Sequence, residues 1–254
     1  MIKIESVYKN FGGVRAVENV IFEIKTGSIT GLIGPNGAGK TTLFNIIAGN
    51  IKPTDGKVFL DGKDITGIPS HLLFNMGLLR TFQIAHEFSS LTVLENLMMV
   101  PSLQIGEKLI NAWIRPKAVK LQEKEIRNKA VEVIDFLKLS HLTQELAGNL
   151  SGGQKKLLEL GRTMMVDAKI VLLDEVGAGV NKTLLNDVIS AILRLNKERG
   201  YTFCMIEHDM DLISRLCDPV IVMAEGSVLA QGTADEIKSN EEVIEAYLGK
   251  GSKK

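Results

Sequence analysis

The sequence has little of what several protein classes require. It holds two cysteines, Cys204 and Cys217, whose spacing matches no metal-ligand pattern, and Cys204 lies inside an apolar run. No stretch of about eighteen uncharged apolar residues occurs, and the N-terminus lacks the apolar core of a secretion signal. We therefore expect buried, reduced thiols, no membrane-spanning helix and a cytoplasmic location.

An excess of positive charge is also missing. Thirty Lys and Arg residues balance thirty Asp and Glu residues, so the formal net charge is zero. Proteins that bind nucleic acid usually carry a basic surface, and the sequence as a whole indicates none. We expect no nucleic-acid partner. What the chain does have is length and apolar content: 254 residues, 45% of them hydrophobic, are enough for a core.

Apolar runs alternate with helical periodicity along the chain. Strands are predicted at residues 2–7, 17–24, 28–33, 57–60, 170–173, 201–206 and 220–223. Helices are predicted at residues 42–47, 184–197 and 209–216, and the period is helical from 92 to 165, with a highly charged helix starting near Pro116. This alternation is typical of a parallel α/β sheet, and the helical stretch predicts an inserted subdomain.

A glycine-rich loop carries the most specific motif. Residues 34–41 match GxxxxGK[ST], follow an apolar strand and open a helix, as the motif requires. The glycines let backbone N–H groups surround a β-phosphate, Lys40 faces the β and γ oxygens, and the Thr41 hydroxyl ligates Mg²⁺. The residues predicted to bind nucleotide here are Gly34, Asn36, Gly37, Ala38, Gly39, Lys40, Thr41 and Thr42.

Polar side chains follow the apolar runs at the edge where α/β sheets bind ligands. Asp174 and Glu175 come directly after residues 170–173. Asp174 is predicted to hold Mg²⁺ and Glu175 to polarise the attacking water as general base, the alternative being a solvated strand end. His208 follows residues 201–206 and could contact the γ-phosphate, although a lone histidine is more often structural.

Two candidates have weaker signals. Gln83 closes a short apolar run and is predicted to reach the metal and the lytic water, although polar residues often end strands. Phe11 lies upstream of the glycine-rich loop, where it could stack on adenine, and core packing is an equal alternative.

A second anion-binding element lies far downstream. Residues 150–154, Leu-Ser-Gly-Gly-Gln, are called the signature segment below. A helix that opens with a serine and two glycines leaves backbone N–H groups accessible to a phosphate. Taken alone, the segment is more simply interpreted as a plain helix start capped by Ser151. The predicted phosphate contacts are Ser151, Gly152, Gly153 and Gln154.

Taken in order, these motifs resemble the nucleotide-binding subunits of ATP-binding-cassette (ABC) transporters, over nearly the whole chain. The resemblance implies an α/β P-loop NTPase fold with a RecA-like core, an N-terminal antiparallel β subdomain and an inserted helical subdomain. The core would comprise residues 1–83 and 166–254, and the helical subdomain residues 84–165. ATP and Mg²⁺ would be the cofactors, with Lys40, Glu175, His208 and Gln83 catalytic and Thr41, Gln83 and Asp174 at the metal.

In that family the signature segment of one cassette closes over ATP held by the loop of another. The resemblance therefore implies a dimer with a second cassette, either another copy or a close paralogue. The loop at residues 176–182 departs from the family pattern, with Val176 and Lys182 where proline is usual and Asn181 where aspartate is usual. Its glycines predict a freer loop and a less defined contact across the dimer.

Finer features are similar to the ATPases of branched-chain amino acid importers and their urea and amide relatives. They lie at residues 79–83, 91–97, 206–210 and 243–249, and in an extended helical segment at 102–120 that contains Trp113. This implies an importer subunit at the inner face of the membrane, with polytopic permease partners and, indirectly, a periplasmic or extracellular solute-binding protein. Lipopolysaccharide-export ATPases and soluble cassettes of iron–sulfur cluster assembly are the alternatives.

Overall fold

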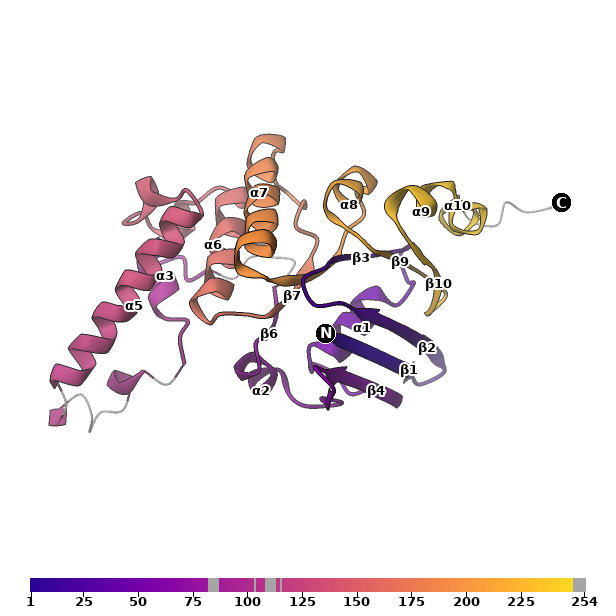
Figure 1. The fold of residues 1–254 in the computed structure, drawn as a ribbon, viewed down its shortest axis with the longest axis horizontal. Coiled ribbons are helices and arrows are strands. Elements are labelled where there is room, and N and C mark those ends of the chain that lie inside the picture. The colour runs from indigo at the N-terminus through magenta and orange to yellow at the C-terminus, as the bar shows by residue number, and fades with distance from the viewer. Residues whose placement is uncertain (82–86, 103, 108–112, 115, 249–254) are drawn as a thin grey trace. The chain divides into compact units, whose positions relative to one another are not determined.

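The computed structural model describes residues 1–81, 87–102, 104–107, 113–114 and 116–248, and Figure 1 shows their fold. Their contacts divide them into two compact units. Unit 1 consists of the described residues within 1–83, 169–178 and 193–254, and unit 2 of those within 84–168 and 179–192. The predicted Gln83 lies outside the described residues.

Strands and helices alternate as the apolar runs predicted. The strands are β1 (Ile2–Phe11), β2 (Val14–Ile24), β3 (Ile29–Ile33), β4 (Asp55–Leu60), β5 (Lys63–Asp64), β6 (Leu78–Arg80), β7 (Ile170–Asp174), β8 (Thr202–Ile206), β9 (Val220–Ala224) and β10 (Ser227–Gly232). The helices are α1 (Lys40–Ile47), α2 (Ser70–Asn75), α3 (Val93–Met98), α5 (Pro116–Phe136), α6 (Gly152–Met165), α7 (Lys182–Arg199), α8 (Met210–Leu216), α9 (Ala234–Ser239) and α10 (Glu241–Leu248). Short 3₁₀ turns lie at Ile105–Glu107, Ser140–Leu142 and Ala147–Asn149.

Unit 1 contains two sheets that differ in direction and burial. One has the order β2-β1-β4-β5 with antiparallel neighbours, and buried residues alternate with more exposed ones over much of β1 and β2. The other has the order β10-β9-β3-β8-β7-β6, and β3, β7 and β8 are buried along their whole length. Such continuous burial is typical of parallel strands covered on both faces, which confirms the predicted α/β class.

The edge of the second sheet corrects the expectation of an all-parallel sheet. β10 pairs antiparallel with β9. The two strands are joined through Glu225 and Gly226, both with positive φ (48° and 84°), the conformation that tight hairpins favour. The sequence predicted no strand here, because β10 is only half-buried and has no continuous apolar run.

The core of unit 1 lies on both sides of helix α1. Phe44 and Leu43 of α1 belong to one buried cluster with residues of both sheets, and Figure 1 shows α1 between them. Helix α8 covers the opposite face of the six-stranded sheet, where Ile213 approaches Gly31 of β3 so closely that an added Cβ would lie 3.1 Å away. The loop before α1 is therefore anchored on a strand packed on both faces.

Unit 2 is built around helices α3, α5 and α6, which contact one another. The start of α7 also belongs to it: an added Cβ on Gly153 would lie 2.4 Å from Leu184 and 3.1 Å from Val180. The bounds that the resemblance implied placed residues 179–192 with the core instead, because local sequence patterns do not report this packing. Helix α7 begins at Lys182, where the Asn181 side chain accepts a hydrogen bond from the Leu184 amide.

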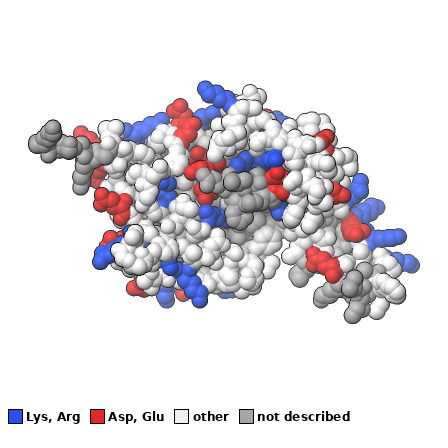
Figure 2. All heavy atoms as spheres, turned by 180° about the vertical axis from the view of Figure 1, so that it is seen from behind, with Lys and Arg blue, Asp and Glu red and all other residues white. Residues whose placement is uncertain are grey.

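Cys204 and Cys217 are buried and unpaired, as predicted. Burial raises the pKa of both thiols, that of Cys217 to about 12, so neither ionises near neutral pH. Within the described ranges, the helices are all too short or too polar to cross a bilayer. On the face shown in Figure 2, basic and acidic side chains are interspersed.

Candidate functional site

The glycine-rich loop joins buried strand β3 to helix α1. Gly39 precedes the helix with φ 92°, and a Cβ there would lie 2.3 Å from the Ala16 carbonyl oxygen, so only glycine fits. No side chain caps α1. Its first N–H groups are therefore available to an anion, and Thr41 is exposed in the same turn.

Lys40 is fixed inside this loop. Its ammonium donates to the carbonyl oxygens of Gly34 (2.7 Å) and Pro35 (3.0 Å), and the residue is 6% exposed. Burial lowers the pKa of Lys40, while the carboxylates of Glu175 and Asp174 oppose that shift. The loop thus holds a cation close to two carboxylates, which suits a phosphate accompanied by a divalent metal ion.

Asp174 ends strand β7 and is tied to Arg80 at the end of neighbouring strand β6. The Arg80 guanidinium donates to Asp174 Oδ2 at 2.7 Å, and both side chains are nearly buried. Arg80 also donates to Asn45 of helix α1 at 2.5 Å. The predicted metal ligand is therefore fixed by a residue to which the sequence assigned no role.

Glu175 and His208 come together although 33 positions separate them in sequence. Glu175 follows β7, His208 lies just beyond β8, and these strands are parallel neighbours. Their nearest side-chain atoms, Glu175 Oε1 and His208 Nε2, are 3.4 Å apart. Glu175 also has φ 49°, a conformation that is strained for a non-glycine residue and is often found at functional sites. Both side chains are partly exposed, Glu175 at 25% and His208 at 45%, so water can reach this edge of the sheet.

Glu207 is a buried carboxylate that the sequence did not single out. It is 5% exposed and accepts hydrogen bonds from the amides of Gly177 (2.8 Å) and His208 (3.3 Å). Burial raises the pKa of Glu207, and these two hydrogen bonds oppose the shift. The bond to Gly177 ties down the first glycine of the 176–182 loop, which was expected to be freer. In the sequence, Glu207 could have been found as a carboxylate that directly follows the apolar run at residues 201–206.

The signature segment opens helix α6 in unit 2. Ser151 is the N-cap: its hydroxyl accepts from the Gln154 amide (3.4 Å), and the Gln154 side chain accepts from the Ser151 amide (2.9 Å). This capping box supports the simpler interpretation of the segment as a helix start. The long Ser151–Gln154 contact and the glycines at the next two positions still leave the helix end open to a phosphate.

Phe11 is 51% exposed at the end of β1, which rules out the alternative of core packing. The Lys9 ammonium lies 5.0 Å from the centre of its ring. An exposed aromatic face remains available for a base. Of the nucleotide-binding residues predicted in the loop, Asn36 and Gly37 are exposed and Ala38 is buried.

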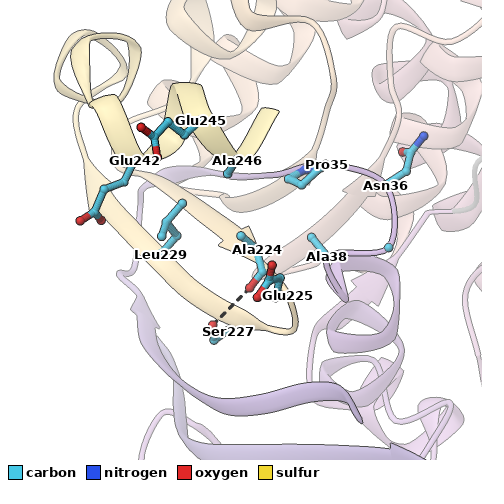
Figure 3. A pocket seen from close by; sticks show the side chains of 11 residues that line it. Pro35, Asn36, Ala38, Ala224, Glu225, Ser227, Leu229, Glu242, Glu245 and Ala246 are labelled. Carbon is cyan, nitrogen blue, oxygen red and sulfur yellow. Dashed lines mark hydrogen bonds between the residues drawn. The ribbon is translucent and has the colours of Figure 1, made fainter. Parts of the chain in front are cut away.

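A pocket of about 560 Å³ lies beside the glycine-rich loop, and Figure 3 shows its lining. It is lined by Pro35, Asn36, Gly37, Ala38, Ala224, Glu225, Ser227, Leu229, Glu242, Glu245 and Ala246. Three of these residues are glutamates, so this side of the loop is unfavourable for phosphate. From α10, burial raises the pKa of Tyr247, and the nearby Gly34 amide opposes that shift.

Among the described residues, no cluster of three His, Cys, Asp or Glu side chains could hold a metal by itself. A nucleotide-bound ion needs fewer protein ligands, because phosphates and water supply the rest. The exposed Thr41 hydroxyl and the Asp174 carboxylate are oxygen ligands of the kind that Mg²⁺ prefers.

Two family models match the chain. The ABC transporter model matches residues 17–178, and the model described as branched-chain amino acid ATP-binding cassette transporter matches residues 227–253. The second match covers β10, α9 and α10, three elements that the apolar runs and helical periodicity did not predict. It therefore assigns the C-terminal part of the chain to a narrower group than the first match does.

Curated and solved relatives agree with these matches. A probable branched-chain amino acid transport ATP-binding protein of Archaeoglobus fulgidus is 42% identical over 253 residues, covering 98% of this chain and 95% of the relative. The ADP conformation of an ATP-binding cassette of an ABC transporter has a TM-score of 0.84 at 36% identity, covering 98% of both chains. A bacterial ABC transporter cassette solved as a dimer has a TM-score of 0.73 at 25% identity, covering 92% and 99%.

Proposed function

The chain belongs to the ABC transporter family and is an ATP-hydrolysing cassette, and from this we propose that it powers the import of branched-chain amino acids or related small solutes. Support for the solute class comes from the C-terminal family match at residues 227–253 and from the 42% identical relative. Neither lipopolysaccharide export nor iron–sulfur cluster assembly has comparable support.

Unit 1 supplies the residues that would hold ATP. The loop amides and Lys40 would bind the β- and γ-phosphates, and the exposed ring of Phe11 would stack on adenine. Thr41, Asp174 and, from the sequence, Gln83 would hold Mg²⁺. When bound, Mg²⁺ neutralises charge that develops on the transferred phosphoryl group.

Glu175 would be the general base. The observation that carries this assignment is its 3.4 Å pairing with His208 at the strand ends next to the loop. Glu175 pairs with His208, whereas the neighbouring Asp174 pairs with Arg80. Glu175 would take a proton from the attacking water, and His208 would contact the γ-phosphate.

The signature segment would act on ATP held by another cassette. Residues 151–154 include no cation, and the next residue, Lys155, pairs with Glu87 at 2.7 Å. The segment therefore has N–H groups and hydroxyl for a phosphate, but none of the charges that bind one tightly. A second copy or a close paralogue would bring the complementary loop, as in the dimeric cassette that this chain resembles.

The remaining partners follow from importer function. A cassette that powers transport works with polytopic permease subunits at the inner face of the membrane, and a periplasmic or extracellular solute-binding protein would deliver the solute. The proposed function requires no nucleic-acid partner.

Replacing Glu175 with glutamine tests the assignment of the base. Glu175→Gln should lower the rate of ATP hydrolysis by about 10² or more, because the neutral amide cannot accept the proton, and ATP-bound dimers should accumulate. Glu198→Gln, in the exposed pair with Arg194, is the matched control. ATP hydrolysis by Glu175→Gln at the wild-type rate would exclude Glu175 as the base.

Uptake by membrane vesicles that contain the whole transporter tests the solute class. Vesicles should take up labelled leucine, isoleucine or valine when ATP is enclosed, and vesicles with Glu175→Gln should not. If ATP-dependent uptake is found for none of these amino acids or their small-solute relatives, the proposed solute class is wrong.

A further inference from the structure

Arg80 connects two parts of the nucleotide site that are far apart in sequence. Its guanidinium donates to Asn45 Oδ1 (2.5 Å) and to Asp174 Oδ2 (2.7 Å), 35 and 94 positions away. The side chain of Arg80 is 11% exposed and that of Asp174 is 9% exposed. The ring of Phe44 lies 5.9 Å from the guanidinium carbon. Both bonds are therefore largely shielded from water.

The two acceptors belong to the elements that carry the proposed Mg²⁺ ligands. Helix α1 has Thr41 in its first turn and Asn45 one turn later, and strand β7 ends in Asp174. A bridge from Asn45 to Asp174 therefore fixes the helix against the strand. It also engages Oδ2 of the Asp174 carboxylate, which fixes the orientation of this predicted metal ligand.

The chemistry of the bridge needs an arginine. The planar guanidinium presents separate N–H groups in fixed directions, and here one terminal nitrogen serves each acceptor. A lysine ammonium is a single point charge and would not hold both acceptors in the same geometry. The Arg80 Nε is buried without an acceptor among the described residues, which costs free energy and is not expected of a residue selected only to stabilise the fold.

We propose that Arg80 is a positioning residue for the metal: it holds Asp174 and helix α1 in the arrangement that binds Mg²⁺ together with the nucleotide. The inference rests on the proposed function, because it takes Asp174 and Thr41 as the Mg²⁺ ligands. Residues that orient metal ligands from outside usually change metal affinity by about 10- to 100-fold when they are replaced. The effect should fall on the metal-dependent part of nucleotide binding.

The test compares ADP binding to the full chain in Mg²⁺ and in EDTA. Arg80→Lys should bind ADP in EDTA within about twofold of the wild-type affinity, because the loop and Lys40 are unchanged. In Mg²⁺ its affinity for ADP should be about tenfold lower than that of the wild type. Electron paramagnetic resonance should show the same loss for Mn²⁺ bound with ADP.

A second variant and a control complete the experiment. Asn45→Ala keeps the ion pair and removes one anchor, so it should lose metal-dependent affinity in the same direction by a smaller factor. Arg194→Lys, in the exposed pair with Glu198, should change neither value. If Arg80→Lys does not fold, Asn45→Ala decides the question.

The two ways to fail are distinguishable. Equal losses in Mg²⁺ and in EDTA, or no loss in either, would overturn the role of Arg80 at the metal. A wild-type chain that binds ADP no better in Mg²⁺ than in EDTA would instead contradict the proposed Mg²⁺ ligands themselves.

Discussion

The two helices that are proposed to contact phosphate, α1 and α6, begin in opposite ways. Helix α1 follows Gly39 and has no side-chain cap, whereas helix α6 starts at Ser151 with a complete capping box. The first turn of α1 contains Lys40, whose ammonium is held by the loop carbonyls. The first turn of α6 has no charged side chain before Lys155, which is paired with Glu87.

This difference indicates a division of roles. Uncapped N–H groups together with a buried cation can hold a phosphate without help, since both charge and hydrogen-bond donors are in place. Helix α6 is stabilised by its own cap and offers mainly donors, so in the proposed function it would recognise a phosphate that another cassette has already bound. Unit 1 would therefore bind ATP, and the signature segment would sense it.

Removing the cation of the loop should have the largest effect. Lys40→Ala should lower the affinity for ATP by about 10²-fold, because it deletes a buried charge that meets the phosphates. Calorimetric titration of the full chain measures this, with Lys25→Ala at an exposed position as control. If Lys40→Ala binds ATP with the wild-type affinity, helix α1 does not depend on its cation, and the proposed difference between α1 and α6 is wrong.

Removing the exposed aromatic ring should have an intermediate effect. Phe11→Ala should weaken ATP binding by about tenfold, since stacking on an aromatic ring is worth about 1–3 kcal/mol per base. Binding of inorganic triphosphate should not change, because it has no base. Val14→Ala, at a nearby position that is 66% exposed, is the control. Equal losses for ATP and triphosphate would exclude a stacking role.

Removing the contact between α10 and the glycine-rich loop should have the smallest effect on ATP affinity. Tyr247→Phe removes the hydroxyl near the Gly34 amide and should lower ATP affinity by about threefold, the size expected for one polar contact. Tyr8→Phe controls for loss of a hydroxyl elsewhere. An unchanged affinity would show that the start of the loop does not depend on α10.

The sequence predicted those parts of the fold and site that local patterns encode. The glycine-rich loop, the run ending at Asp174 and the run before His208 each combine a strand with a polar end. Because parallel strands carry their carboxyl ends to one edge, the meeting of Glu175 and His208 could be anticipated. The ABC family and the α/β fold were confirmed; the residue roles remain predictions.

Other features depend on contacts that no local pattern reports. The bridge from Arg80 to Asp174 spans 94 positions. Strand β10 is half-buried, so its apolar signal was too weak to predict a strand. Residues 179–192 join unit 2 through packing against Gly153, which periodicity along the chain cannot show.

The central claim is that the signature segment acts on ATP bound by another cassette, and one pair of variants at Ser151 tests it most directly. Asp and Asn cap helices about equally well, so Ser151→Asp and Ser151→Asn differ mainly by a negative charge at the proposed phosphate contact.

The measurement is the ATP affinity of the monomer together with ATP-dependent dimer formation, both in the Glu175→Gln background. We predict that Ser151→Asp binds ATP as monomer with unchanged affinity but no longer forms dimers, while Ser151→Asn still forms them. Weaker ATP binding by the Ser151→Asp monomer, with the Asn variant unaffected, would place the signature segment at the ATP of its own chain and contradict the account.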